Sequence, residues 1–290
     1  MTAASSILLI TLDSCRYDTF EQVRPPHLSA LGPLHRTMAP GNFTLSSHTA
    51  IFAGFTPGDA HSPTPLVNPK RGKFFRLAQG GRKGKTEDFM VLEGRSIVEG
   101  LSRLGYKTLG TGAVDWFNPS TPASDGLIRD FDAFYHPEKT PDLRAQLRWI
   151  QTQLNESPSA PVFVFLNIGE THVPYFHEGA PWSPSENPCR PFAKDNDRAL
   201  CESRQKACLS WVDTELSALL KQFAHANTIV CADHGDAWGE DGIWEHGVHH
   251  PKVLEVPLLF RLSEPPRNAA STIDTLKDKA RRLLGGDSPS

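Results

Sequence analysis

Residues 228–247 read TIVCADHGDAWGEDGIWEHG, a short apolar run that ends in Asp233-His234 and breaks into a loop punctuated by glycines. An apolar run of this length is typical of a buried strand. At the carboxyl end of such a strand the chain leaves the sheet, so a neighbouring carboxylate and imidazole can turn toward one cation. The alternative is a solvated turn, because Asp, His and Gly are ordinary loop residues.

A second acidic residue follows an apolar run near the amino terminus. Residues 7–12 read ILLITL, the continuous pattern of a parallel strand covered on both faces, and Asp13 comes directly after them. In an open α/β sheet the carboxyl ends of the central strands face one crevice. We therefore expect Asp13 and Asp233 to meet in space despite their separation in sequence.

The order of the remaining elements indicates an alternating α/β fold. Apolar residues at helical spacing alternate with short apolar runs, which predicts helices and strands in turn. The predicted segments are helices at 96–104, 142–154 and 197–223 and strands at 107–111, 162–168 and 228–232. Strand, helix and strand repeated in this way imply a mainly parallel central sheet with helices on both faces.

Length and composition are those of an ordinary globular protein. With 290 residues, 39% hydrophobic composition and a formal net charge of −3, the chain is long enough for one large domain. We expect that domain to span 1–265, with inserted loops near 56–90 and 174–196. Residues 266–290 are predicted to form an amphipathic helix and a flexible tail.

Several classes of protein are disfavoured by the same composition. No stretch approaches the roughly 20 apolar residues of a membrane span, and no signal-peptide pattern is present, so the sequence predicts a cytoplasmic protein. Five cysteines without zinc-finger spacing favour free thiols over a disulfide framework. The basic residues within 56–90 lack regular aromatic neighbours in a chain that is acidic overall, so no nucleic-acid partner is expected.

Taken together, these motifs resemble the alkaline phosphatase and sulfatase superfamily of metal-dependent hydrolases. Its members carry an acid after the first strand, a nucleophile at the start of a helix and an Asp-His pair after a late strand. The resemblance covers residues 7–18, 39–57, 101–112, 162–175, 208–220 and 228–260. It implies a three-layer α/β sandwich with a catalytic domain over 1–265. Little chain follows Phe260, so we expect a reduced carboxy-terminal subdomain, with the crevice either more open or completed by a second copy of the chain.

Residues 39–54, APGNFTLSSHTAIFAG, bear on the type of reaction. Sulfatases have Cys or Ser at the position of Thr44, and Pro and Arg where this chain has Ser46 and His48, so a formylglycine sulfatase is disfavoured. Thr44 resembles the nucleophile of the phosphodiesterase and phosphotransferase branches. Coordination to a divalent cation lowers the pKa of such a hydroxyl. Thr44 as a helix N-cap, and Ser46 or Ser47 as the nucleophile, are the alternatives.

The late motif is similar to that of lipid-directed phosphoethanolamine transferases over 233–247. In that group, the histidines that match His172 and His246 contact the transferred group or a second metal. Those enzymes also have an amino-terminal membrane domain, for which this sequence shows no segment.

The donor set implied by the resemblance fits one divalent cation, Zn²⁺ or Mn²⁺. Its expected ligands are three oxygens and one imidazole, from Asp13, Thr44, Asp233 and His234. His172 and His246 are expected to bind non-bridging oxygens or to protonate the leaving group, because imidazole has a pKa near neutrality. A second cation is an alternative, with candidate ligands Glu170, His172, His246, His249 and His250.

Four residues are candidates for substrate binding: Arg16, His48, Glu170 and Lys252. Arg16 either neutralises substrate charge or pairs with Asp18. His48, one helical turn after Thr44, faces either the ligand or the surface. Lys252 falls near a position where many sulfatases have a substrate lysine.

The function predicted from the sequence is hydrolysis of a small-molecule phosphate mono- or diester with Thr44 as nucleophile. The alternatives are transfer of the phosphorus-containing group to an acceptor alcohol, sulfate ester hydrolysis, and a non-catalytic binding module.

Overall fold

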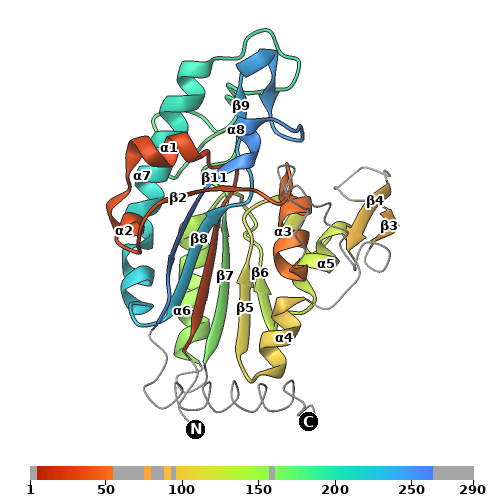
Figure 1. Cartoon of the computed structure of the whole chain (residues 1–290), viewed down its shortest axis with the longest axis vertical. Coiled ribbons are helices and arrows are strands. Elements are labelled where there is room, and N and C mark those ends of the chain that lie inside the picture. The colour runs from red at the N-terminus through yellow and green to blue at the C-terminus, as the bar shows by residue number, and fades with distance from the viewer. Residues whose placement is uncertain (1–4, 55–74, 80–87, 93–95, 157–160, 264–290) are drawn as a thin grey trace, which may run out of the picture.

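A mixed β-sheet runs through the centre of the computed structural model (Figure 1), which describes residues 5–54, 75–79, 88–92, 96–156 and 161–263. Within these residues it has seven strands, in the order β2 (His35–Met38), β11 (Glu255–Arg261), β8 (Asn227–Ala232), β1 (Ile7–Leu12), β7 (Val162–Ile168), β5 (Lys107–Thr111) and β6 (Ala133–Tyr135). Strands β8, β1, β7, β5 and β6 run parallel, whereas β11 is antiparallel to both of its neighbours.

Helices cover both faces of this sheet (Figure 1). One face carries α1 (Tyr17–Val23), α2 (Pro26–Ser29), α6 (Leu143–Asn155) and α7 (Arg198–Gln222). The other carries α3 (Thr44–Ala53), α4 (Ile97–Arg103) and α5 (Asp125–Ile128). The short helix α8 (Pro251–Leu254) leads into β11, and two small hairpins consist of β3 (Phe75–Gln79) with β4 (Asp88–Leu92), and β9 (Ala237–Trp238) with β10 (Trp244–Glu245).

Side chains of the central strands point alternately to the two faces of the sheet and so contribute to two apolar cores. In β1, Leu8 and Ile10 join the cluster that includes α7, whereas Leu9 joins the opposite cluster. In β7 all seven residues are buried, with Phe163 and Phe165 on the side of α3. Each such side chain contributes roughly 1.5–3 kcal/mol when fully buried. The continuous apolar runs in the sequence therefore arise because both faces of these strands are covered.

The predicted fold class is confirmed. Strands 7–12, 107–111 and 162–168 have the predicted bounds, and the strand predicted from Thr228 begins at Asn227. The three predicted helices are present, and each begins after a capping side chain: Ser96, Asp142 and Asp197 accept hydrogen bonds from backbone amides three residues on. Strand β11, the antiparallel strand, was not predicted from the sequence, because its Pro257 is atypical of a strand interior.

The predicted insertions are described only in part. Residues 174–196 link β7 to α7 without a helix or strand. Most of 56–90 and all of 266–290 lie outside the described residues. No helix in the described part of the chain is both long and apolar enough to cross a bilayer.

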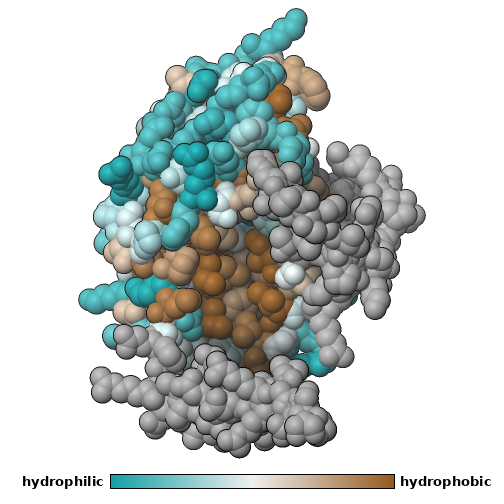
Figure 2. Space-filling view, in the orientation of Figure 1, coloured by the Kyte–Doolittle hydropathy of each residue, from teal (hydrophilic) through white to brown (hydrophobic). Residues whose placement is uncertain are grey.

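The surface divides into two regions in Figure 2. Hydrophilic residues cover the upper end of the molecule, and apolar residues gather over the middle of the sheet on the face in view. Strand β1 runs upward from the amino terminus toward α1 (Figure 1). The carboxyl ends of the parallel strands therefore open at the hydrophilic end.

Candidate metal centre and active site

Two strand ends bring acidic side chains together. Asp13 follows β1 and Asp233 follows β8, and the register of these parallel strands pairs Leu12 with Ala232, so the next residues are neighbours. Asp13, Asp233 and His234 are all fully buried. Each offers a ligand atom, and these atoms lie within 4.8 Å of one another. The structure thus brings Asp13 and Asp233 together at the carboxyl ends of neighbouring strands, as the strand order predicts.

Thr44 adds a hydroxyl to this group from helix α3. Its Oγ1 lies 3.4 Å from Asp13 Oδ2 and 3.4 Å from His234 Nε2. The N-cap of α3 is Phe43, without a side-chain cap, so Thr44 does not serve as the cap. The neighbouring hydroxyls are engaged elsewhere, since Ser46 donates to Phe43 O and Ser47 donates to Asp233 O. Of these three hydroxyls, only that of Thr44 is directed at Asp13 and His234.

The electrostatics of the group favour a cation. Burial, followed by repulsion from Asp13, raises the pKa of Asp233 well above its ordinary value. Asp233 Oδ1 accepts from the backbone amides of Ser14 and His234, but Oδ2 is buried without a hydrogen-bond partner. A buried carboxylate oxygen with no donor is costly, and a divalent ion would satisfy it. The residues present therefore fit a bound metal.

His234 is held in the form that a metal ligand requires. Burial first, and the nearby His246 second, lower the pKa of His234 to about 3, so its imidazole is neutral at pH 7. Its Nδ1 lies 3.0 Å from Gly235 O, to which a protonated Nδ1 donates. This hydrogen bond leaves the lone pair of Nε2 directed toward Asp13 and Thr44.

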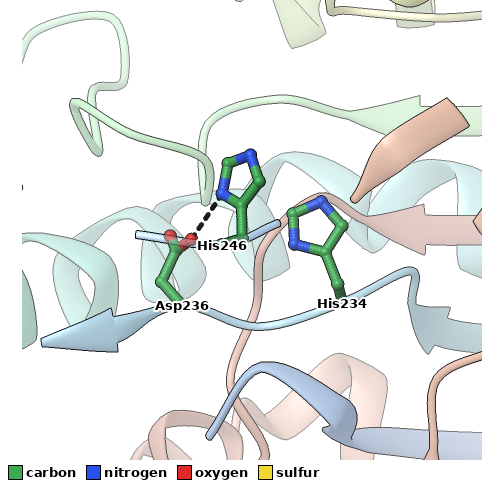
Figure 3. Close-up of side chains that lie close together, drawn as sticks. All are labelled: His234, Asp236 and His246. Carbon is green, nitrogen blue, oxygen red and sulfur yellow. Dashed lines mark hydrogen bonds and ion pairs between the residues drawn. The ribbon is translucent and has the colours of Figure 1, made fainter. Parts of the chain in front are cut away.

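A second group lies beside the first and shares His234 with it. His234, Asp236 and His246 also offer ligand atoms within 4.8 Å of one another, and the Nδ1 of His246 is 2.7 Å from Asp236 Oδ1 (Figure 3). The His246 ring lies 4.4 Å from that of His234 and 5.1 Å from that of His172. The structure thus brings both predicted catalytic histidines to the group. Asp236 was not singled out from the sequence, although it lies in the same loop as Asp233.

Charge pairing holds the second group together. Burial disfavours charge on both partners, but their hydrogen bond outweighs it, lowering the pKa of Asp236 and raising that of His246. Asp236 and His246 therefore form an ion pair at the rim of the metal group, where His246 is 10% exposed.

Arg16 and Lys252, two of the predicted substrate-binding residues, meet at Asp18. Arg16 is buried and donates to Asp18 from Nε and Nη2 at 2.8 and 2.6 Å. Its Nη1 donates to Glu240 at 3.0 Å, and Lys252 Nζ lies 2.8 Å from Asp18 Oδ2. Pairing of Arg16 with Asp18, one of the two interpretations left open by the sequence, is what the structure shows.

His48 lies behind Thr44 and not on the surface, so that alternative is wrong. Its ring is fully buried against Phe117 and Phe165. Nδ1 is 2.8 Å from Thr44 O, and Nε2 is 2.9 Å from Thr11 Oγ1. Burial lowers the pKa of His48 to about 4, which keeps the ring neutral. Both ring nitrogens are engaged, and the contact with Thr44 O supports the first turn of α3.

Glu170 and the last two histidine candidates lie outside both groups. Glu170 Oε1 accepts from Leu143 N at the start of α6, and Oε2 is buried without a partner. Burial raises the pKa of Glu170 to about 7. His250 caps α8 by accepting from Lys252 N, and His249 is exposed. Neither histidine belongs to a potential metal group among the described residues.

Comparison with solved structures finds the same fold in several other proteins. The chain is similar to the C-terminal periplasmic domain of EptC from Escherichia coli in complex with Zn, with a TM-score of 0.60, 14% identity, and coverage of 91% of this chain and 74% of that one. The chain is also similar to phosphonate monoester hydrolase of Agrobacterium radiobacter, with a TM-score of 0.58, 16% identity, and coverage of 89% of this chain and 68% of that one. A third similar structure is that of a protein in the alkaline phosphatase superfamily from Vibrio parahaemolyticus. Its TM-score is 0.52, its identity is 15%, and the match covers 91% of this chain and 61% of that one.

These likenesses are ones of fold. No protein-family model and no curated protein matched the sequence. The EptC structure is of a periplasmic domain, so the cytoplasmic location expected from the sequence stays a prediction. The architecture itself is that of the alkaline phosphatase-like α/β sandwich.

Proposed function

We propose that this chain, which has the fold of the alkaline phosphatase superfamily, is a metal-dependent enzyme that cleaves small-molecule phosphate mono- or diesters with Thr44 as nucleophile. The observation that carries the proposal is the position of the Thr44 hydroxyl, 3.4 Å from both Asp13 Oδ2 and His234 Nε2. A threonine hydroxyl is a poor nucleophile at neutral pH unless a neighbouring group activates it. Asp13, Asp233 and His234 lie around this hydroxyl, and a metal ion held by them would activate it.

Asp13, Asp233 and His234, together with Thr44, would hold one divalent ion. Zn²⁺ or Mn²⁺ fits the mixed oxygen and imidazole donors, and when bound it supplies Lewis acidity and lowers the pKa of a coordinated hydroxyl. The unpartnered Oδ2 of Asp233 supports this assignment, because it is the atom that most needs a positive partner.

The remaining groups of the site act on the phosphoester. Thr44 Oγ1 forms a bond to phosphorus, the bond from phosphorus to the leaving oxygen breaks, and the hydroxyl proton of Thr44 passes to solvent water. The amides at the amino end of α3, which has no side-chain cap, attract a phosphoryl oxygen. His172 and His246 lie at the open side, where one of them protonates the leaving oxygen.

Transfer to an acceptor alcohol is the second candidate. It shares the first step with hydrolysis and differs only in whether water or an alcohol attacks the phosphothreonine. The structural likeness to the C-terminal periplasmic domain of phosphoethanolamine transferase EptC from Campylobacter jejuni supports this second candidate.

The test is hydrolysis of bis-p-nitrophenyl phosphate, p-nitrophenyl phosphate and p-nitrophenyl sulfate by metal-stripped protein resupplied with Zn²⁺ or Mn²⁺. We expect metal-restored phosphoester cleavage that falls by about 10³-fold or more in Thr44→Ala. Thr44→Ser should recover part of it, and Thr49→Ala, in the next turn of α3, is the matched control.

Each other outcome has a definite meaning. Cleavage that survives in Thr44→Ala would show that another group is the nucleophile. Bound metal without cleavage of any ester would favour the binding-module interpretation. Sulfate release in place of phosphate release would support the sulfatase alternative, and a product that appears only with added alcohol would identify a transferase.

A further inference from the structure

A chain of buried hydrogen bonds runs from the second group into the protein interior. Asp236 accepts at both oxygens: His246 Nδ1 is 2.7 Å from Oδ1, and the Tyr175 hydroxyl donates to Oδ2 at 2.7 Å. Trp238 Nε1 in turn donates to the Tyr175 oxygen at 2.8 Å. Asp236 and Tyr175 are fully buried and Trp238 is 2% exposed, so water does not compete for these bonds.

The surrounding structure holds this chain in place. The Arg16 guanidinium lies 4.0 Å above the Trp238 ring and donates to Asp236 O at 3.2 Å. Tyr175 has φ = 57° and Glu245, which precedes His246, has φ = 70°. Left-handed backbone is unfavourable for such residues and persists where packing dictates it, commonly at functional sites. The segments that carry Tyr175 and His246 are thus held in strained conformations on either side of Asp236.

We propose that Asp236 and Tyr175 are positioning residues that fix the His246 ring with Nδ1 protonated, so that Nε2 faces the phosphoester. This inference rests on the proposed function for the role of His246, but not for its tautomer. Each oxygen of Asp236 already accepts a short hydrogen bond, so this proposal assigns Asp236 to positioning His246 and not to binding a second metal. Within the described residues Nε2 has no hydrogen-bond partner, so the ring, when charged, is free to donate from Nε2 to a substrate oxygen.

The arrangement makes an unusual prediction for Asp236→Asn. The Tyr175 oxygen already accepts from Trp238, so its hydroxyl hydrogen needs an acceptor, and the Asn oxygen must turn toward it. The Asn amide nitrogen then faces His246 Nδ1 and donates to it. Nδ1 must therefore accept, and the proton moves to Nε2, which reverses the tautomer. Removing the hydroxyl with Tyr175→Phe frees the Asn side chain to flip back.

The test uses metal-free protein labelled with ¹⁵N-histidine, at a pH where the His246 imidazole is neutral. We expect wild type to show His246 protonated at Nδ1, Asp236→Asn to show Nε2 protonated, and the double variant Asp236→Asn/Tyr175→Phe to recover the Nδ1 form. The matched control is Tyr106→Phe, whose hydroxyl donates to Ser5 O away from this network. Thermal melting checks that each variant is folded.

Kinetics of the metal-loaded protein provide the second measurement. Asp236→Asn should lower kcat about 10²-fold or more with little change in KM, since a ring whose Nδ1 must accept a hydrogen bond cannot carry protons on both nitrogens and so cannot protonate the leaving oxygen from Nε2. Tyr175→Phe alone should lower kcat about tenfold, and the double variant should exceed Asp236→Asn. A merely structural role for Tyr175 predicts the opposite, with the double variant worse than either single one.

Three results would overturn the proposal. They are wild-type His246 protonated at Nε2, an Asp236→Asn tautomer unchanged from wild type, and a second bound metal equivalent that disappears in Asp236→Asn. If wild type cleaves no phosphoester at all, the proposed function fails, but the tautomers of the metal-free variants still decide whether Asp236 and Tyr175 position His246.

Discussion

Asp233 is buried with one carboxylate oxygen that has no hydrogen-bond partner, next to a second buried carboxylate, Asp13. Burial first, and repulsion from Asp13 second, raise the pKa of Asp233, so charge on this carboxyl destabilises the metal-free fold. The arrangement becomes favourable only when a positive charge is added. A residue that costs stability in the absence of ligand is typical of a functional site.

Glu170 is a buried acid that lies outside the group of potential metal ligands. Burial raises its pKa from 4.5 to about 7. Its folded pKa lies above its unfolded one, so the stability that the protonated form provides is present below about pH 4.5 and is lost as the pH rises to about 7. We expect Glu170→Gln to gain about 3 kcal/mol relative to wild type between pH 4.5 and pH 8.

The measurement is urea denaturation of both metal-free proteins at the two pH values. Glu156→Gln, an exposed acid that ends α6, controls for the removal of one negative charge. If the difference in unfolding free energy between Glu170→Gln and wild type is the same at both pH values, burial does not raise the pKa of Glu170 as expected.

At the scale of elements, the turn that follows β8 depends on a glycine. A Cβ atom at Gly235 would lie 2.4 Å from Lys252 O, a backbone atom of α8, and Gly235 N donates to Val253 O at 2.7 Å. Neither segment yields as a flexible side chain does, so an added methyl group must displace the turn that carries Asp233 and His234. We expect Gly235→Ala to lose roughly 1–3 kcal/mol of stability and to bind metal at least about tenfold more weakly.

Calorimetry and metal titration check this prediction against Gly126→Ala. Gly126 lies in α5, where an added Cβ meets no atom within 4 Å, so that variant should be as stable as wild type or slightly more stable. Equal behaviour of the two alanine variants would show that the turn after β8 adapts without cost.

At the scale of the whole molecule, the site joins segments that are far apart in the chain. Asp13 follows β1, Thr44 begins α3 and Asp233 follows β8, so an ion bound by them would link both halves of the sequence across the sheet. A ligand that binds only the folded state stabilises it by about 2.7 kcal/mol at a concentration 100 times its Kd. We expect Zn²⁺ or Mn²⁺ to raise the melting temperature and a chelator to reverse the increase.

The Asp13→Asn variant should separate the repulsion between Asp13 and Asp233 from the proposed role of Asp13 as a metal ligand. Without metal, the variant is expected to be more stable than wild type, because the repulsion on Asp233 is removed. With metal, it should show little further stabilisation, since an oxygen ligand with charge is gone. Melting curves recorded without metal test the expected gain in stability, and curves recorded with metal test the expected loss of stabilisation by the ion. A variant that responds to metal as wild type does would exclude Asp13 as a ligand.

The order of the main elements and the residues of the first group could be predicted from the amino-acid sequence. Apolar runs and helical spacing are local properties of the chain, so strands such as 7–12 and 162–168 were predicted with their observed bounds. The rule that parallel strand ends face one crevice then sufficed to expect Asp13 and Asp233 together. Their roles as metal ligands stay a prediction.

The partners of the side chains around that group could be identified only in the folded chain. The burial of His48, the pairing of Arg16 with Asp18 and Glu240, and the contact of Tyr175 with Asp236 all depend on how separate segments pack. The period of a strand or helix sets the face on which a residue lies, but its partner belongs to another segment, whose position is fixed by the packing of the whole fold. For that reason Asp236, an ordinary loop acid in the sequence, emerged as the residue that orients His246 only when the folded loops were in view.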